Sequence, residues 1–546
     1  MGVFLERETG PCSSACPAGI DVPRYVRLIA GRRFDEALMI IMEKIPFPSV
    51  CGQVCFAPCE AKCNANYLGS PIAIRALKRF VARRPNAVRR IPSPLRATGK
   101  RVGVVGSGPA GLTAAYDLKL LGHGVTVFEA EREPGGMMRY GIPDYRLPKE
   151  LLRGEIEAIK NLGVDIKTNE RIENPVELLG HYDAVLVAIG AAKSASLGIE
   201  GETLPIVKNA IGLMKDINNG KKITLGSKVL VIGGGNGAID AARSALRLGS
   251  QEVYVFYRRS CTEMPASPSE VDEAQKEGVK IQFLIEPLRI TMVGGRANVE
   301  CIRTQLTEEI DPSGRKKPIQ LPGTEFSDVA DTLIVAAGQV CELPPGFSSI
   351  ATGNFVQADP NTMSTSQVGI LAAGAAIRGG SSVIEAISAG IRAASCIDRY
   401  LGDKIEIQTR SVLTEPGPVQ SELQGIPPSR RVNIPKIPVS ERLKDFSPIE
   451  LELKEEQAVE EAKRCLACDL PIVIEPDYCV GCLTCVLRCA SRLHDRVDEE
   501  KSKIRVLPML ERSNALIFRE GCEVCGICAR YCPHGALYRQ RKYFGS

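Results

Sequence analysis

The sequence predicts a multidomain α/β protein with a cysteine-rich segment at each end. Three observations lead to this fold class. The chain has 546 residues, which at roughly 100 to 200 residues per domain allows about three to five domains. Its 20 cysteines concentrate near the two ends. The region between them alternates apolar strand patterns with helical ones, as α/β domains do.

The overall composition excludes several classes of protein. The 69 basic residues nearly balance the 64 acidic ones, and no block of like charge predicts a nucleic-acid partner or a membrane surface. The first residues lack the basic start and apolar run of a secretion signal, and no apolar stretch is long enough for a membrane-spanning helix. We therefore expect a cytoplasmic protein. Thiols are kept reduced there, so the cysteines predict metal sites rather than disulfides.

The first strand of the middle region ends in a glycine-rich turn. An apolar run at 101–105 leads into Gly106, Gly108 and Gly111, and a helical pattern follows. Glycines at this spacing allow a tight turn, let backbone N–H groups approach a pyrophosphate, and begin a helix whose positive end faces it. Glu129 ends the next strand, where an acid binds a ribose hydroxyl. This unit predicts a dinucleotide-binding site.

A second unit of the same kind begins with the apolar run at 228–232. Its turn contains Gly233, Gly235, Asn236 and Ala238. An alanine at the last position is compatible with the packing of helix on strand. The next strand continues into Arg258 and Arg259, and guanidinium groups suit a 2′-phosphate. This favours NADP over NAD, although an ordinary solvated basic pair is the alternative.

Six stretches make a family resemblance specific. They are Gly106-Ser-Gly-Pro-Ala-Gly-Leu, Pro134-Gly-Gly-Met-Met-Arg-Tyr-Gly-Ile-Pro, Tyr145-Arg-Leu-Pro, Gly233-Gly-Gly-Asn, Tyr257-Arg-Arg-Ser and Glu263-Met-Pro. With them, residues 1 to about 405 resemble the small subunit of NADPH-dependent glutamate synthase and its relatives. The resemblance implies FAD on the first unit, NADPH on the second, and hydride transfer between nicotinamide C4 and flavin N5. It also adds Gly136, Arg146 and Gly374 to the cofactor-binding residues.

The same resemblance implies the domain order. A helical iron–sulfur domain (1–98) precedes a Rossmann-like FAD domain (99–221 and 339–405), into which a Rossmann-like NAD(P)H domain (222–338) is inserted. One departure concerns the flavin. The family usually has a Gly-Asp pair near its last helix, whereas this chain has Gly374 followed by Ala375. FAD is still expected, and no catalytic side chain is needed because the cofactors carry the chemistry.

The strongest signal lies in the C-terminal cysteines. Two runs with the spacing Cys-x2-Cys-x2-Cys-x3-Cys begin at Cys479 and at Cys522, the pattern of bacterial ferredoxins. In such pairs of runs, three thiolates hold one 4Fe-4S cluster and the fourth crosses to the other. The predicted ligand sets are Cys479, Cys482, Cys485 and Cys532 for one cluster, and Cys522, Cys525, Cys528 and Cys489 for the other. Zinc motifs pair their cysteines differently.

This segment, 451–546, is predicted to be an α+β ferredoxin domain and resembles the ferredoxin-like electron-transfer subunits of anaerobic oxidoreductases. A proline-rich linker, 406–450, precedes it. Such linkers are extended and semi-rigid.

The N-terminal cysteines are Cys12, Cys16, Cys51, Cys55, Cys59 and Cys63. In the glutamate synthase family this region holds two 4Fe-4S clusters, which six thiolates cannot complete. The segment Arg464-Cys465-Leu-Ala-Cys468 looks like the Arg-Cys-x-x-Cys element that the family carries ahead of its first cysteines. By family analogy, Cys12, Cys63, Cys465 and Cys468 hold one cluster and Cys16, Cys51, Cys55 and Cys59 the other.

Two further points belong to this N-terminal prediction. Relatives place a glutamine or glutamate ligand where this chain has Lys78, which cannot ligate while protonated. The alternative for Cys465 and Cys468 is an unmetallated pair or a small zinc site.

Together these patterns predict an NAD(P)H-dependent oxidoreductase that passes electrons between NADPH, FAD and four 4Fe-4S clusters. We expect it to be the electron-transfer subunit of a hetero-oligomeric redox complex, working with a substrate-transforming oxidoreductase or with ferredoxin. Two alternatives stay open. One is a non-enzymatic iron–sulfur subunit whose flavin site has degenerated, as Ala375 allows. The other is a glutamate synthase small subunit.

Overall fold

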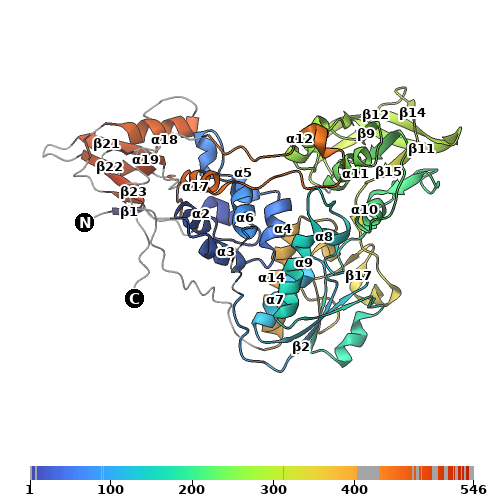
Figure 1. Cartoon of the computed structure of the whole chain (residues 1–546), viewed down its shortest axis with the longest axis horizontal. Helices are drawn as coiled ribbons and strands as arrows, with labels where there is room; N and C mark the ends of the chain where they lie inside the picture. The colour runs from blue at the N-terminus through green and yellow to red at the C-terminus, as the bar shows by residue number, and fades with distance from the viewer. Residues whose placement is uncertain are drawn as a thin grey trace. The chain divides into compact units, whose positions relative to one another are not determined.

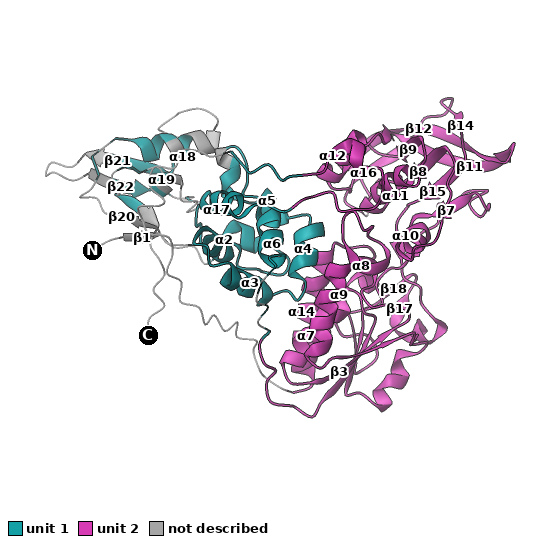
Figure 2. Ribbon diagram, in the orientation of Figure 1, with its two compact units in different colours: residues 1–91, 407–435, 452–546 teal, residues 92–406, 436–451 magenta. Residues whose placement is uncertain are grey.

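The computed structural model divides into two compact units, which are described separately (Figures 1 and 2). The first comprises residues 1–91, 407–435 and 452–546, and the second residues 92–406 and 436–451. The structure describes the whole chain except residues 1, 2, 6–8, 86, 88, 90, 312, 403–429, 470, 471, 475–478, 481, 495–501, 509–513, 520, 521, 523–526, 531, 534, 535 and 540–546. Cys525 and most of the predicted linker therefore lie outside the described residues.

The second unit is built on two parallel sheets. The first sheet has the order β19-β5-β2-β3-β4, and its strands are β2 (Arg101–Val105), β3 (Gly124–Glu129), β4 (Asp165–Thr168), β5 (Ala184–Val187) and β19 (Ile370–Ala372). All four pairings are parallel. The side chains of β5 and β19 are all buried, as in sheets covered on both faces. Helices α7 (Pro109–Leu120) and α14 (Val383–Tyr400) pack against each other.

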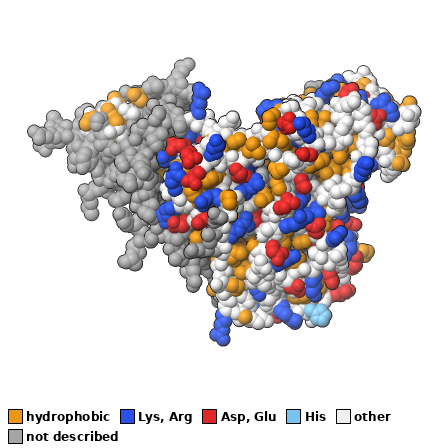
Figure 3. Space-filling model, in the orientation of Figure 1, with side chains coloured by type: hydrophobic (Ala, Val, Ile, Leu, Met, Phe, Trp, Pro, Cys, Tyr) orange, Lys and Arg blue, Asp and Glu red, His pale blue; other side chains and the backbone are white. Residues whose placement is uncertain are grey.

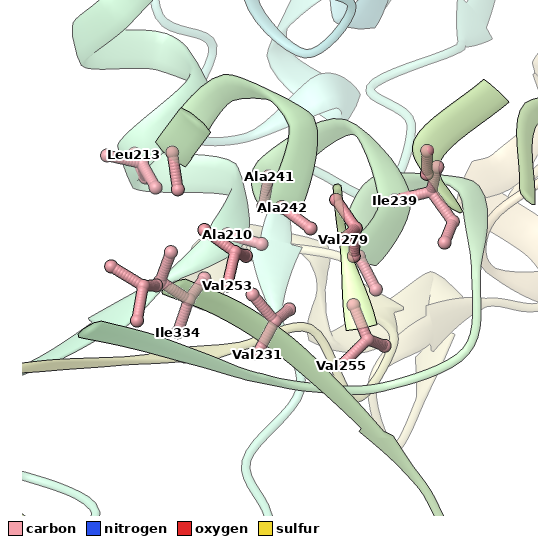
Figure 4. Close-up of a cluster of buried hydrophobic side chains, with 14 of the residues drawn as sticks. Ala210, Leu213, Val231, Ile239, Ala241, Ala242, Val253, Val255, Val279 and Ile334 are labelled. Atoms are coloured by element: carbon pink, nitrogen blue, oxygen red, sulfur yellow. The ribbon is translucent and has the colours of Figure 1, made fainter. Parts of the chain in front are cut away.

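The second sheet of this unit has the order β10-β9-β8-β15-β7. Its strands are β7 (Val207–Asn209), β8 (Lys228–Ile232), β9 (Glu252–Tyr257), β10 (Lys280–Phe283) and β15 (Thr332–Val335). They lie within the sequence between β5 and β19, so the chain completes the second sheet before it returns to the first. Valines of β8 and β9 pack against alanines of helix α11 (Asn236–Arg247), which forms the core shown in Figure 4.

Several smaller elements complete this unit. Helices α10 (Ala210–Asn218) and α12 (Pro268–Lys276) pack against α11. Strands β11 (Ile285–Val293), β12 (Arg296–Ile310), β13 (Lys316–Gln320) and β14 (Phe326–Ala330) form an antiparallel sheet. Residues 436–451 are fastened to α12, because the Arg442 guanidinium pairs with Glu273 and Lys436 Nζ lies 2.9 Å from the same carboxylate.

The first unit begins with short helices. They are α1 (Pro11–Ser14), α2 (Val22–Ala30), α3 (Phe34–Met42), α4 (Pro48–Val54), α5 (Pro58–Ala61) and α6 (Ile74–Ala82). Proline stands at the first position of α1, α4 and α5, where its fixed φ favours helix initiation. Helix α17 (Glu455–Lys463) packs against α2 and α6, so a segment that follows the predicted linker joins this helical group.

The rest of the first unit is built around two short sheets. Strands β1 (Val3–Leu5), β20 (Ile472–Ile474) and β23 (Leu537–Arg539) pair antiparallel, and β21 (Ile504–Pro508) pairs with β22 (Asn514–Phe518) as a second antiparallel pair. Helices α18 (Thr484–His494) and α19 (Ile527–Arg530) pack together. The core between them contains Cys485 and Cys528.

Two features of the described residues bear on partners. Basic and acidic side chains are intermixed on the face of the molecule in Figure 3. No helix in the described part of the chain is long and apolar enough to cross a membrane.

Candidate functional site

The first glycine turn lies at the carboxyl end of β2, where α7 begins. A Cβ on Gly106 would lie 2.5 Å from the carbonyl oxygen of Ala188, and a Cβ on Gly111 would overlap the carbonyl oxygen of Gly106. A Cβ on Gly108 would meet nothing within 4 Å. The outer two glycines are therefore required by the packing of the protein itself. The middle one leaves open space in front of the first turn of α7, as a bound pyrophosphate requires.

Glu129 closes one side of this turn. Its side chain is only 7% exposed, and its carboxylate accepts hydrogen bonds from Ser107 N (3.0 Å), Ser107 Oγ and Glu131 N (2.8 Å). Two other predicted residues approach the same turn. A Cβ on Gly136 would lie 2.8 Å from Gly108 Cα, and one on Gly374 would lie 2.9 Å from Ala110 Cβ. The structure therefore brings the first predicted set together, apart from Arg146.

Arg146 is engaged within the protein. Its Nη1 donates to both carboxylate oxygens of Asp240, at 2.9 and 2.7 Å. Burial lowers the pKa of Arg146, but the carboxylates of Asp240 and Glu270 outweigh this effect and raise it. The ion pair ties the segment after Tyr145 to helix α11. The expected contact between Arg146 and a cofactor stays a prediction.

The second glycine turn repeats the geometry of the first. A Cβ on Gly233 would overlap the carbonyl oxygen of Ala336, whereas one on Gly235 would meet nothing within 4 Å. Asn236 Oδ1 accepts a hydrogen bond from Ser267 N at 3.0 Å, and Ala238 is buried in the core between α11 and β8. The open space again lies at a helix N-terminus that follows a parallel strand.

The two arginines after β9 have different surroundings. The Arg259 side chain is buried, pairs with the Asp311 carboxylate and donates from Nε to the carbonyl oxygen of Lys316 at 2.9 Å. The Arg258 side chain is 51% exposed, and its Nη1 lies 3.5 Å from Glu286. Arg258 therefore has the more accessible guanidinium. Sequence reasoning treated the two as equivalent because it cannot see the Asp311 partner.

Four C-terminal cysteines line one cavity. The cysteines are Cys479, Cys482, Cys485 and Cys532, and the apolar side chains around them include Leu483, Val506 and Leu516. Burial, with smaller contributions from the neighbouring Cys532, Cys479 and Cys482, raises the pKa of Cys485 to about 12, against the lowering effect of a hydrogen bond from the Val486 backbone. These are the four residues predicted as one ligand set, drawn from both cysteine runs.

The other C-terminal set is described in part. Cys528 is buried in the core around Ile504, with Cys489 packed against that core. Cys489 Sγ accepts a hydrogen bond from Lys503 N at 3.3 Å. Cys522 is half-buried. Cys525, the fourth predicted member, lies outside the described residues.

Cysteines from both ends of the chain meet in the first unit. Burial raises the pKa of Cys12, and the next largest effects come from Cys465, Cys468 and Cys63. Asn64 Nδ2 donates to Cys468 Sγ at 3.3 Å. We call Cys12, Cys63, Cys465 and Cys468 the split group, because it joins residues from two distant segments.

Three side chains of the late segment of the split group, Asp469, Glu461 and Arg464, hold it against earlier residues of the first unit. Arg27 donates to both carboxylate oxygens of Asp469, at 2.6 and 3.0 Å. Glu461 accepts hydrogen bonds from Ala73 N and Val432 N, at 2.7 and 2.8 Å. Arg464 pairs with Glu461 at 2.6 Å and donates to Ser70 O at 2.7 Å. These contacts are the structural reason that Cys465 and Cys468 reach Cys12.

The remaining four cysteines surround a buried lysine. Burial lowers the pKa of Lys78, but Cys55, Cys51, Cys59 and Cys16 raise it, and the net shift is upward. In turn, Lys78 lowers the pKa of Cys59 against the larger raising effect of burial. We call Cys16, Cys51, Cys55 and Cys59 the N-terminal group.

Left-handed backbone recurs in the cysteine loops. Ala57, Ala467 and Leu483 have φ values of 51°, 47° and 55°, and each lies between two cysteines of a predicted set. The Ala57 N–H donates to Cys55 Sγ at 3.4 Å, and the Ala467 N–H donates to the sulfur of Cys465. Such bonds to sulfur tune iron–sulfur clusters. Sequence reasoning missed these residues because none of them is a glycine.

Among the described residues, no three Cys, His, Asp or Glu side chains are arranged to hold a single metal ion.

Comparison with known proteins identifies the family. Residues 100–390, more than half of the chain, match the pyridine nucleotide-disulphide oxidoreductase family. The chain belongs to that family. Residues 5–89 match dihydropyrimidine dehydrogenase domain II with its 4Fe-4S cluster. This oxidoreductase therefore combines an FAD/NADP-binding fold with a 4Fe-4S domain.

Three relatives place the oxidoreductase more closely. It is 39% identical to the NADP(+)-dependent formate dehydrogenase subunit beta of Moorella thermoacetica, over 84% of this chain and 70% of that protein. It is 36% identical to the NADPH-Fe(3+) oxidoreductase subunit beta of Geobacter sulfurreducens, over 85% and 76%. It is 31% identical to the small chain of Escherichia coli NADPH glutamate synthase, over 71% and 88%.

These comparisons confirm the expected resemblance to the glutamate synthase small subunit and the expectation of an NAD(P)H-dependent flavin and iron–sulfur oxidoreductase subunit. The individual cofactor-binding residues, the cysteine ligands and the domain boundaries stay predictions.

Proposed function

We propose that this oxidoreductase passes electrons between NADPH, FAD and four 4Fe-4S clusters, as the electron-transfer subunit of a larger redox complex. The names of two relatives support the subunit role, since each is the beta subunit of an NADP-linked or NADPH-linked enzyme. The partner would be a second subunit that transforms the substrate, or a ferredoxin.

The glycine turns support the placement of the two dinucleotides. FAD would bind at Gly106, Gly108 and Gly111, with Glu129 on its ribose, and NADPH would bind at Gly233 and Gly235. At each turn, the middle glycine leaves the space that a pyrophosphate would occupy. The bound cofactors supply the hydride chemistry. The protein residues would hold the two pyrophosphates against helix N-termini.

The observation that carries the proposal is the meeting of cysteines from distant segments. Cys532 joins the first C-terminal run at one cavity, and Cys465 joins Cys12 in the split group. The described cysteines form no disulfides, so four converging thiols indicate a bound metal group. Each 4Fe-4S cluster takes four thiolates. The four proposed ligand sets are the two C-terminal sets, the split group and the N-terminal group.

Iron content tests the proposal in protein purified without oxygen. Four 4Fe-4S clusters predict roughly sixteen irons per chain. A Cys465→Ala/Cys468→Ala variant should lose about four of them while it keeps both C-terminal clusters. The matched control is Cys261→Ala/Cys396→Ala, which removes two cysteines outside every proposed set and should keep all the iron.

The outcome separates the parts of the proposal. A Cys465→Ala/Cys468→Ala variant with full iron would refute the split cluster alone. A parent protein with full iron but no flavin, or with a flavin that NADPH does not bleach, would refute the route through FAD.

A further inference from the structure

The split group and the N-terminal group lie in different electrostatic surroundings. Two arginines act electrostatically on the split group, Arg27 on Cys465 and Arg464 on Cys63. Each arginine also has a carboxylate partner, Asp469 for Arg27 and Glu461 for Arg464, both at 2.6 Å. Each positive charge at this group is therefore accompanied by a carboxylate in direct contact with it.

Lys78 has no such partner in the part of the chain that the structure describes: no ion pair joins its ammonium to a carboxylate there. The side chain is only 4% exposed. The groups that act electrostatically on its ammonium include all four cysteines of the N-terminal group. Glu60, adjacent to Cys59, pairs instead with Arg431 at 2.6 Å. Lys78 therefore directs an uncompensated buried charge at these four sulfurs.

The fold fixes this arrangement through a close contact of two helices. Gly52 follows Cys51 in α4, and a Cβ at Gly52 would lie 2.7 Å from Arg79 Cα in α6. The two backbones can approach this closely only because residue 52 is glycine. The contact brings α4, which carries Cys51, against α6, which carries Lys78. A buried ammonium is costly unless negative charge compensates it, and a thiolate-bound cluster would supply that charge.

We propose that Lys78 tunes the cluster of the N-terminal group, and that its buried positive charge makes this cluster easier to reduce than the cluster of the split group. The inference rests on the proposed function, because it assumes a 4Fe-4S cluster at each group. Reduction adds one electron to a cluster that already carries net negative charge. A cation inside the protein stabilises the reduced form more than the oxidised one, and water screens it little.

The test is a redox titration of the holoprotein, followed by electron paramagnetic resonance. The Cys465→Ala/Cys468→Ala variant identifies the signal of the split cluster by its loss, and a Cys51→Ala/Cys55→Ala variant identifies the signal of the N-terminal group in the same way. Lys78→Met removes the charge at similar length. It should lower the midpoint potential of this cluster by at least a tenfold change in the reduction equilibrium, about 59 mV for one electron, and leave the other clusters unchanged.

Two control variants separate charge from packing. Lys78→Arg keeps the charge and should keep the potential near that of the parent. Lys62→Met removes an exposed lysine next to Cys63, where water screens the charge, and should shift no potential by a comparable amount.

Each outcome decides the proposal. A Lys78→Met protein that keeps its iron and its potential would overturn it and leave the four-cluster function standing. If Lys78→Met loses about four irons while Lys78→Arg keeps them, the charge is required at this cluster and the proposal is supported. Loss of the iron from both variants would show a packing role and overturn it. A parent protein short of roughly sixteen irons would refute the underlying function instead.

Discussion

The two glycine turns of the second unit differ in how tightly each helix sits on its strand. In the first turn, the third position is Gly111, where a Cβ would overlap the carbonyl oxygen of Gly106. In the second turn, the third position is Ala238, whose methyl group is buried in the core. Both middle glycines face open space. The difference teaches that the third position follows local helix packing, whereas the protein itself places nothing against the middle position, where we propose that the pyrophosphate binds.

The turns also differ in the residues at the end of the next strand. Glu129 is buried and hydrogen-bonded to the first turn through Ser107. Beyond the second turn, the next strand is followed by Arg258 and Arg259 instead, of which only Arg258 is largely exposed. A carboxylate suits a ribose hydroxyl and a guanidinium suits a phosphate. The contrast therefore predicts different dinucleotides on two similar turns.

The largest expected effect comes from exchanging the third positions. Gly111→Ala should abolish flavin binding, because the new methyl group cannot fit against Gly106 without moving the turn. Ala238→Gly should keep NADPH binding and cost about 1 kcal/mol of stability, the difference in helix propensity. Bound flavin per chain and thermal unfolding measure the two effects. A Gly111→Ala protein with full flavin would contradict the packing explanation.

The second effect concerns the choice between NADPH and NADH. Arg258→Ala should weaken NADPH binding by about 1.5 to 3 kcal/mol for each charge-assisted bond lost, and leave NADH binding nearly unchanged. Dissociation constants for both cofactors measure this directly. Equal weakening of NADPH and NADH would remove the assignment of Arg258 to the 2′-phosphate.

Arg259→Ala is the matched control for that prediction. It removes a guanidinium that is already paired with Asp311 and bonded to Lys316 O. We expect it to lower the unfolding temperature, because it removes a part-buried hydrogen bond and the ion pair with Asp311. It should change the ratio of the NADPH and NADH dissociation constants less than Arg258→Ala does. The double variant should show the same ratio as Arg258→Ala.

A smaller effect, on stability, should come from the N-terminal cap of helix α14. Ser382 caps α14, accepting from Glu385 N at 3.3 Å, while the Glu385 carboxylate accepts from Ser382 N at 2.8 Å. Helix α11 of the second sheet has no side-chain cap. Ser382→Ala should therefore destabilise the protein by about 0.5 to 2 kcal/mol, measured by denaturant unfolding. A change of Gly235, the residue before α11, to serine tests whether the second helix gains from a similar cap.

Local patterns in the sequence predicted the parts of the site that depend on nearby residues. The glycine turns followed from strand, turn and helix patterns at positions such as Gly106 and Gly233, because close backbone packing and open space both require glycine. The cysteine spacing in the runs that begin at Cys479 and Cys522 predicted two ligand sets, because a cluster needs thiolates at fixed separations. The comparisons confirm the flavoprotein family that the glycine turns indicated and a 4Fe-4S domain at residues 5–89, whereas the clusters at the C-terminal cysteine runs stay a prediction.

Contacts between distant residues that belong to no cysteine or glycine motif were beyond the reach of the sequence. Nothing near Arg259 in the chain indicates its pairing with Asp311, and Arg146 gives no sign that it binds Asp240. His123 is another case, since its Nε2 lies 3.0 Å from Asp398 across 275 positions of the chain. Such pairs are set by tertiary packing, so they leave no periodic trace in the sequence.

The smallest expected effect tests whether the first turn still needs its missing acid. Gly374 has a φ of 73°, and a short helix begins at Ala375. This segment lies against helix α7, since a Cβ on Gly374 would lie 2.9 Å from Ala110 Cβ. An aspartate at 375 would place a carboxylate where the resembled family holds a ribityl hydroxyl. The bond gained, roughly 1.5 to 3 kcal/mol, is opposed by the desolvation of a half-buried charge.

We therefore expect Ala375→Asp to tighten FAD by no more than about tenfold, which is 1.4 kcal/mol, or to leave it unchanged. The rate of flavin release from the holoprotein measures this. Ala376→Asp is the control, because Ala376 is fully buried and a charge there lacks a partner, so that variant should lose stability. Faster flavin release from Ala375→Asp than from the parent would show that residue 375 does not face the ribityl chain. The turn would then hold FAD through its glycines, Glu129 and helix α14.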